Sequence, residues 1–266
     1  MTTAALLRGR GWKPDTSDFI QKTARFGLPH IGFGAPLLVP KSVDLLTEHA
    51  RFLDQINSDG CVGFGFVGSI ETRLRFLGYN PVPFSPQGVW TMPRQMSRVS
   101  AFEPLRNEGT HPYLASYCIR TFGIPTEDEF PFDPNDLTKE IDFDTLGRAS
   151  SFRLDGFSRI AERDDQLVEM IKQLLAAGHP VPYGSYVGRK YMDWKTGQDP
   201  VGVEDGDPVG GGHFIYLTGY EDDGNVFRSV GSYGKGHGDN GTVLIAREKI
   251  VAASSSDFYN MTIVEK

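Results

Sequence analysis

Cys61 is the residue of this sequence best placed to act as a nucleophile. It stands at the predicted start of a helix, where unpaired backbone N–H groups and the positive end of the helix dipole favour a thiolate. A free cysteine is also among the most often buried residue types, so plain core packing is the alternative role. Cys118 lies between Tyr117 and Ile119 in another predicted helix. It has no such feature, and we expect it to pack in the core.

A thiolate nucleophile needs a base, and the chain has six histidines. His213 differs from the others because it follows the segment DPVGGG and opens the run FIYLTGY, which brings an imidazole into an apolar strand. Its alternative role is a rim histidine satisfied by its neighbours. The remaining ones lie in loops or beside charged residues, so we expect solvated surface positions for His30, His49, His111 and His179, and a loop position outside any site for His237.

Gln55 is a candidate partner of the thiol. It lies six residues before Cys61, across the turn-like sequence QINSDG, so its side chain can reach back toward the sulfur. An amide in that place can donate a hydrogen bond to an oxyanion that forms beside the sulfur. The three residues would then supply a nucleophile, a base and an oxyanion donor.

The elements that position these residues follow from the apolar pattern. Spacings of three and four predict a helix over 61–77, with one buried face formed by Phe66, Val67, Ile70, Leu74 and Leu77. Glycines in its first turns each cost about 1 kcal/mol relative to alanine, so we expect a close backbone approach at Gly63, Gly65 and Gly68. Further helices are predicted over 111–123 and 164–177, the latter capped by Asp164 or Asp165.

Strands dominate the second half of the chain. β-Branched and aromatic runs bounded by turns predict strands over 181–187, 213–221, 226–233 and 242–248, with EDDGN joining the second and third as a hairpin. Residues 79–110 are rich in Pro, Gly and Ser and are expected to be a loop. Helices in the first half and an antiparallel sheet in the second predict an α+β protein with two lobes.

Composition narrows the functional classes. The chain has 266 residues and a net charge of −7, so it is large enough for a substantial core and has no excess positive charge for nucleic acid. It contains no run of 18 apolar residues, and its first residues lack the features of a secretory signal. Two cysteines are too few for a disulfide framework. We therefore expect no nucleic-acid partner, no membrane segment and no signal peptide.

Three segments resemble the papain-like (C1 family) cysteine peptidases. DQINSDGCVGFGF (54–66) is similar to the family's Gln-to-Cys segment, and GGGHFIYLTGYEDDG (210–224) to its histidine strand. GSYGKGHGDNGTVLIAR (231–247) is similar to the Asn-Ser-Trp-Gly segment, which comes after the histidine strand in the family. The opening GWKPDTSD and LVPKSVDLL are similar to the amino-terminal region of prokaryotic and viral members, so the resemblance covers most of the chain.

This resemblance implies a papain-like two-lobed fold with the active-site cleft between the lobes. Residues 1–40 would be an extended N-terminal segment, followed by a helical lobe at about 41–150 and a β-rich lobe at about 151–266. Cys61 would be the nucleophile, His213 the base and then the acid, and Gln55 with the Cys61 N–H the oxyanion hole. We expect a depressed Cys61 pKa and a distance of roughly 3–5 Å between its sulfur and the His213 ring.

Departures from the family pattern bear on activity. The orienting asparagine of the family falls on Gly231, which has no side chain, and the tryptophan after the nucleophile is Val62. The aromatic residues that shield the histidine correspond to Tyr233 and His237. An orienting residue fixes the base without being the nucleophile, so its loss is expected to lower the rate, and Gly231→Asn is expected to raise turnover. A cysteine of the family's disulfide corresponds to Ser58, which suits a reducing compartment.

The expected function is peptide-bond hydrolysis on a polypeptide substrate, without a metal or organic cofactor. Two alternatives stay open. One is a cysteine acyltransferase or isopeptidase, which uses the same thiol and imidazole with another acceptor. The other is a degenerate relative that serves as a structural or binding subunit, for example of a virus particle, for which Gly231 is the main argument. A cytoplasmic or virion-associated location and assembly into a larger complex are further expectations.

Overall fold

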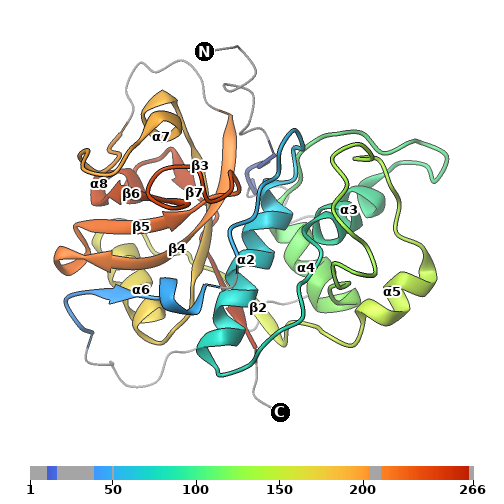
Figure 1. Ribbon diagram of the computed structural model, residues 1–266, viewed down its shortest axis with the longest axis horizontal. Coiled ribbons are helices and arrows are strands. Elements are labelled where there is room, and N and C mark those ends of the chain that lie inside the picture. The colour runs from blue at the N-terminus through green and yellow to red at the C-terminus, as the bar shows by residue number, and fades with distance from the viewer. Residues whose placement is uncertain (1–10, 17–38, 50, 204–210, 264–266) are drawn as a thin grey trace.

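The computed structural model describes residues 11–16, 39–49, 51–203 and 211–263. The helix α2 (Cys61–Phe76) lies in the middle, with helices on one side of it and an antiparallel sheet on the other (Figure 1). This arrangement confirms the predicted α+β, two-lobed architecture. Within the described ranges, no helix has both the length and the apolar character needed to cross a membrane.

The helical lobe contains α3 (Pro86–Ser97), α4 (Pro112–Phe122) and α5 (Phe143–Ala149). The predicted helices over 61–77 and 111–123 are confirmed as α2 and α4. The prediction of a loop over 79–110 was wrong, because α3 lies within it. Ser85 caps this helix by accepting a hydrogen bond from the Gly88 N–H at 2.8 Å, and Pro86 occupies its first turn. Gly88 and Pro93 inside the helix had masked its periodicity.

The sheet lobe is built on strands in the order β6-β5-β4-β3-β7, with β1 paired to the end of β4. All pairs in this sheet are antiparallel, and η3 (Asp222–Gly224) joins β4 to β5 as the predicted hairpin. The four predicted strands are confirmed to within a few residues. The strand bounds are β1 (Val43–Asp44), β3 (Val181–Tyr186), β4 (Gly212–Glu221), β5 (Val226–Val230), β6 (Thr242–Ala246) and β7 (Ser255–Ser256).

Short and long helices surround this sheet. They are η2 (Leu46–Glu48), α6 (Asp164–Ala176), α7 (Arg189–Asp193) and α8 (Arg247–Val251). The predicted helix over 164–177 is confirmed as α6, whose apolar face packs on β3 and β4. Its predicted cap was wrong: Arg163 is the N-cap residue, and no side chain caps the first turn. Asp164 and Asp165 lie inside the first turn, where their charges still favour the helix dipole.

The lobes exchange segments near their boundary. β2 (Gly156–Arg159) and β8 (Tyr259–Thr262) form a separate antiparallel pair, and Phe157 and Met261 from this pair join the apolar core of the helical lobe. In the other direction, β1 and η2 precede α2 in sequence but lie with the sheet. Each lobe therefore takes chain from both sides of the predicted division near residue 150.

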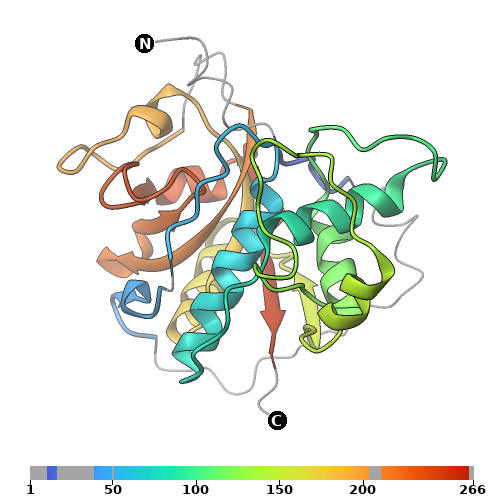
Figure 2. The same cartoon turned by 45° about the vertical axis from the view of Figure 1, so that its right-hand side comes forward.

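Glycines let α2 pack tightly on both lobes. A Cβ built on Gly63 would lie 2.3 Å from the Pro86 carbonyl oxygen on α3. A Cβ on Gly65 would lie 2.8 Å from the Phe214 ring on β4, and a Cβ on Gly68 would lie 2.5 Å from the Tyr216 hydroxyl oxygen on the same strand. The close backbone approach expected from the sequence is present, and Figure 2 shows α2 running between the two lobes.

Candidate active site

Cys61 begins α2 at the point where β4 passes the helix. The backbone N–H of Phe214, the residue after His213, donates a hydrogen bond to Sγ of Cys61 at 3.3 Å. Cys61 and His213 are both fully buried. The fold thus brings the predicted nucleophile beside the strand that carries the predicted base, from positions 152 residues apart in the sequence.

The ionisation of Cys61 in this conformation differs from the sequence prediction. Burial raises the pKa of the Cys61 thiol to about 12, and the nearby charge of Asp59 raises it further. Backbone N–H groups of Phe214, Gly11 and Val62 lower this pKa, but their effect is smaller. The prediction of a depressed pKa is wrong for the covered thiol, because loss of hydration outweighs the helix terminus.

Residues 11 and 12 cover the thiol. The Gly11 carbonyl accepts a hydrogen bond from the Thr110 N–H at 2.9 Å, and the Trp12 N–H donates to the Gly212 carbonyl at 3.3 Å. A Cβ built on Gly11 would lie 2.8 Å from Sγ of Cys61. The segment therefore joins the helical lobe to β4 directly over the sulfur, and it is seen in dark blue at the start of α2 (Figure 1). The other parts of the predicted extended segment, 1–10 and 17–38, lie outside the described residues.

The Trp12 indole holds this cover in place. It is buried against Gly184 on β3 and Gly212 on β4, where any Cβ would meet the indole at 2.0 Å and 2.6 Å. Its ring also contacts Tyr186 edge-on, with centroids 5.2 Å apart. The absence of side chains at Gly184 and Gly212 is what makes room for the indole beside His213. Gly212 belongs to the glycine-rich segment that the sequence analysis singled out.

A buried carboxyl pair anchors the same segment. The indole Nε1–H of Trp12 and the backbone N–H of Asp15 both donate to Asp257, at 3.0 Å and 2.9 Å. The Arg159 guanidinium also donates a hydrogen bond to Asp257 at 2.9 Å and forms an ion pair with it, so the carboxylate charge of Asp257 is paired. Asp15 accepts a hydrogen bond from the Tyr259 hydroxyl at 2.5 Å. Burial, and then the adjacent charge of Asp257, raise the pKa of Asp15 to about 7.

His213 lies in a cluster of rings. Its ring centroid is 4.7 Å from that of Tyr233 and 6.3 Å from that of Tyr191, and the His237 ring packs against both tyrosines at 4.9 Å and 5.5 Å. We call these four residues the ring cluster. Neither nitrogen of His213 has a hydrogen-bond partner among the described residues. Burial, and then the charge of His237, lower the pKa of His213 to about 3.

The expectation that His237 lies outside any site is therefore wrong, whereas the resemblance, which assigns it to a ring position near His213, agrees with the structure. His237 does lie in a loop, but its ring belongs to the ring cluster around the predicted base. The surface positions expected for other histidines were also wrong, since His49, His111 and His179 are all half-buried. His49 contacts the Tyr216 hydroxyl at 2.6 Å and stacks on Phe52, and burial lowers the pKa values of His49 and His179 to about 4. His30 lies outside the described residues.

Gly231 lies next to the base. A Cβ built on it would be 3.4 Å from Nε2 of His213 and 2.9 Å from the Tyr191 hydroxyl. Gly231 is not among the glycines with a left-handed backbone, so its conformation is one that other residues can adopt. The position that the resemblance assigns to the orienting asparagine thus faces His213, and part of the space for its side chain is filled by Tyr191.

Gln55 is held by the loop after β5. It is fully buried, its Oε1 accepts a hydrogen bond from the Ser232 hydroxyl at 2.5 Å, and its backbone N–H donates to the Ser232 carbonyl at 2.9 Å. Its side-chain Nε2 donates to the Ser58 carbonyl at 2.6 Å, within the turn that leads to Cys61. The sequence analysis missed Ser232, although it named both of its neighbours, Gly231 and Tyr233.

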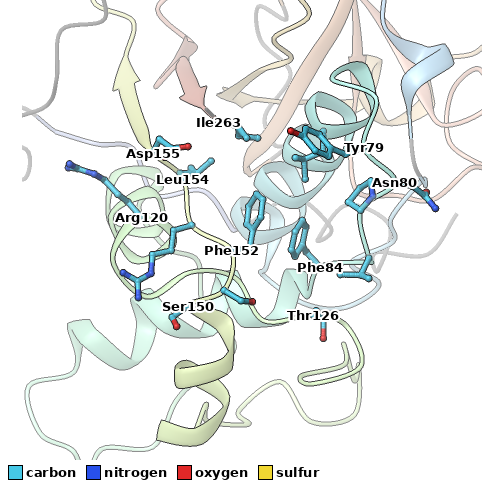
Figure 3. Close-up of a pocket in the computed structure, with 15 residues that line it drawn as sticks. Tyr79, Asn80, Phe84, Arg120, Thr126, Ser150, Phe152, Leu154, Asp155 and Ile263 are labelled. Atoms are coloured by element: carbon cyan, nitrogen blue, oxygen red, sulfur yellow. The ribbon is translucent and has the colours of Figure 1, made fainter. Parts of the chain in front are cut away.

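Other candidate features lie apart from these residues. Cys118 packs in the core as predicted, and burial raises its pKa. A cavity of about 820 Å³ opens beyond the end of α2, between residues 79–84 and 150–155, where Phe84 and Phe152 line it side by side (Figure 3). Among the residues that the structure describes, no group of three or more His, Cys, Asp or Glu could hold a metal ion.

Comparison with known proteins supports the fold. No protein-family model and no curated protein matches the chain. Solved structures do match it. The chain is similar to xylellain, a cysteine protease from Xylella fastidiosa, with 21% identity, a TM-score of 0.77 and 97% of each chain covered. It is also similar to digestive procathepsin L 3 of the Tenebrio molitor larval midgut, with 17% identity and a TM-score of 0.70, covering 89% of this chain and 73% of that one.

A third likeness is to the Carica candamarcensis cysteine protease CMS1MS2 in complex with E-64, with 18% identity and a TM-score of 0.64. The match covers 85% of this chain and all of that one. At these identities the likenesses establish the architecture. The chain has the fold of papain-like cysteine proteases, as its motifs predicted.

Proposed function

We propose that the protein is a cysteine peptidase that hydrolyses peptide bonds with Cys61 as nucleophile and His213 as general base. The observation that carries this proposal is the hydrogen bond from Phe214, next to His213, to the Cys61 sulfur at the start of α2. This bond joins the only thiol at a helix N-terminus in the described chain to the residue that follows a fully buried histidine on β4. The papain-like fold supports the same assignment.

The chemistry follows from the residues present. His213 takes the proton of the Cys61 thiol, and the thiolate attacks the scissile carbonyl carbon of a polypeptide. The Gln55 amide and the Cys61 N–H then stabilise the oxyanion. The His213 imidazolium gives its proton to the leaving amine, which leaves an acyl-enzyme. His213 next activates a water molecule, which releases the acid and regenerates the thiol. No cofactor takes part in these proposed reaction steps.

Residues 11 and 12 must move before any substrate reaches the sulfur. With Cys61 and His213 fully buried and the thiol pKa raised by burial, the covered conformation holds a neutral thiol beside a neutral imidazole. Exposure of the site to water would reverse the burial that dominates both pKa shifts. The proposed enzyme is therefore active only in a conformation where Trp12 has left Gly184 and Gly212.

The two free thiols also bear on the location of the protein. Free cysteines are typical of a reducing compartment, so we place the protein in the cytoplasm, or within a virion if its source is viral.

A structural or binding subunit is the second candidate function. The closed cover over Cys61 and the absent side chain at Gly231 favour it.

The experiment compares four chains: the parent, Cys61→Ala, Trp12→Ala and the double variant. Each is incubated under reducing conditions with a peptide mixture, and new termini are identified by mass spectrometry. We expect cleavage by Trp12→Ala above that by the parent, and none by either Cys61→Ala chain. Adding an amine acceptor separates hydrolysis from acyl transfer, because a transferase would yield the amide. If Trp12→Ala neither cleaves peptides nor reacts with a thiol probe, the peptidase proposal is refuted and the structural or binding subunit is the remaining candidate.

A further inference from the structure

The base of the proposed peptidase lacks a group to orient it. His213 is fully buried, and neither of its ring nitrogens has a partner among the described residues. A buried polar atom without a hydrogen bond costs about 1–3 kcal/mol. A base whose tautomer is not fixed also presents the wrong nitrogen part of the time. Some neighbouring group therefore has to pair with the imidazole when the site is at work.

The Tyr191 hydroxyl is the polar group placed to do so. The three atoms nearest to a Cβ built on Gly231 are the Tyr191 hydroxyl oxygen at 2.9 Å, Nε2 of His213 at 3.4 Å and a ring carbon of Tyr233 at 3.4 Å. A side chain on residue 231 would thus begin in contact with both the hydroxyl and the imidazole. Tyr191 is itself 1% exposed, so its ring has little freedom to move away.

The other members of the ring cluster are placed less well. Tyr233 meets the Gly231 position through a ring carbon, so it packs on the imidazole instead of facing its nitrogen with oxygen. His237 contacts the rings of Tyr191 and Tyr233, at 5.5 Å and 4.9 Å between centroids, and no ring contact joins it to His213 among the described residues. Its positive form would repel a protonated His213, as its lowering effect on the His213 pKa indicates.

We propose that Tyr191 is the positioning residue for His213, its hydroxyl accepting a hydrogen bond from Nε2–H in the place where Gly231 leaves no side chain. This inference rests on the proposed function. A proton fixed on Nε2 leaves the lone pair on Nδ1, which is the form that can take the thiol proton. The two atoms lie 2.9 Å and 3.4 Å from the same Cβ position, so rotation of the rings has to bring them within hydrogen-bond distance of each other.

The proposal changes what Gly231→Asn should do. From the sequence alone this substitution is expected to raise turnover. In the structure its Cβ would lie only 2.9 Å from the Tyr191 hydroxyl, so the new amide competes with the group already there. We expect little gain in the parent background. In Tyr191→Phe the obstructing oxygen is gone, and Gly231→Asn should there supply the missing acceptor.

The test uses ¹⁵N-histidine NMR on the full chain. The resonances of His213 are assigned by their loss in His213→Gln. In the parent we expect the neutral ring to carry its proton on Nε2, with a slowly exchanging N–H signal. In Tyr191→Phe, which keeps the ring and so the packing, that signal should broaden or disappear and the two tautomers should mix. Tyr233→Phe removes the same atom from the other tyrosine of the ring cluster and should leave the tautomer unchanged.

Kinetics supply the second readout. In the Trp12→Ala background, Tyr191→Phe should slow alkylation of Cys61 by iodoacetamide about 10-fold and shift its pH profile, and adding Gly231→Asn should restore most of the rate. An unchanged His213 tautomer in a folded Tyr191→Phe chain, or no restoration by Gly231→Asn, overturns the proposal. The two hypotheses fail separately: an unreactive Cys61 refutes the peptidase, whereas the NMR result still decides the role of Tyr191.

Discussion

At the scale of single residues, the Cys61 thiol is subject to two opposed influences. A helix N-terminus and a nearby imidazole stabilise a thiolate, whereas burial stabilises the neutral thiol. In the covered conformation burial prevails, because Gly11 and Trp12 exclude water from a fully buried sulfur. The reactivity of Cys61 is therefore decided by the residues that cover it.

Removing the indole of Trp12 should expose the thiol. Trp12→Ala deletes a buried ring and its hydrogen bond to Asp257, a loss of about 3–5 kcal/mol for a large buried side chain. If only part of this loss weakens the docking of residues 11 and 12 over the sulfur, alkylation of Cys61 by iodoacetamide should still become at least about 10-fold faster at pH 7. Mass spectrometry of tryptic peptides measures the rate.

Cys118 provides the internal control for that labelling. It is fully buried on α4 in the helical lobe, so its labelling rate should stay low and equal in both chains. Faster labelling of Cys118 in Trp12→Ala would mean general unfolding. Equal labelling of Cys61 in parent and variant would show that Trp12 does not control access to the sulfur.

At the scale of elements, α2 performs two tasks. It presents Cys61 at its first position, and it packs so closely on α3 and β4 that side chains are excluded at Gly63, Gly65 and Gly68. The glycines lower the intrinsic stability of the helix, and tertiary packing on both sides offsets that loss. The position of the nucleophile thus depends on contacts made one to two turns further along the helix.

Gly63→Ala should destabilise the protein. The new methyl group would lie 2.3 Å from the backbone oxygen of Pro86 and 2.9 Å from Cβ of Trp90, so α2 and α3 must separate. Overpacking of this kind costs about 1–3 kcal/mol in the free energy of unfolding, measured by urea denaturation. The matched control is Gly147→Ala in α5, where a Cβ meets no atom within 4 Å and the helix should gain up to about 1 kcal/mol. Similar losses at both sites would contradict the packing argument.

The elements that the sequence predicted are those with strong local patterns. α2, α4 and α6 show apolar spacings of three and four, and β3 to β6 are β-branched or aromatic runs between turns. α3 was missed because Gly88 and Pro93 interrupt its pattern. Asp257 and Tyr191 gave no signal, since their importance comes from contacts with residues far away in the sequence: Trp12 lies 245 positions from Asp257.

For the candidate site, the sequence supplied residue types but not their environment. Cys61, His213 and Gln55 were proposed from motif order and spacing. Their burial could not be predicted, because the cover comes from residues 11 and 12, which show no periodicity of their own. The proximity of Tyr191 to Gly231 was equally hidden, since α7 lies in a stretch without a recognisable pattern.

At the scale of the whole molecule, residues 11–15 fasten the two lobes together. Gly11 pairs with Thr110 in the helical lobe, Trp12 pairs with Gly212 in the sheet lobe, and Asp15 meets Asp257 between β7 and β8. The charged and titratable groups that face Asp15 are Asp257, Arg159, Tyr259, Tyr113 and His111. Of the two carboxyl groups, Asp257 has the guanidinium, so a proton taken up by the pair goes to Asp15.

Docking of this segment should therefore weaken as the pH rises. Free Asp15 has an ordinary pKa of about 4, and docking raises that pKa to about 7. The docked form is therefore most stable below pH 4, loses stability from pH 4 to 7 and is least stable above pH 7. Asp15→Asn cannot ionise, so the ratio of Cys61 alkylation rates, parent over Asp15→Asn, should rise across pH 4 to 7 and then level off. Ionisation of the thiol is common to both chains and cancels in this ratio. A ratio that stays flat or falls with pH would show that Asp15 does not govern the cover, and the fastening would then depend on Trp12 and the backbone hydrogen bonds alone.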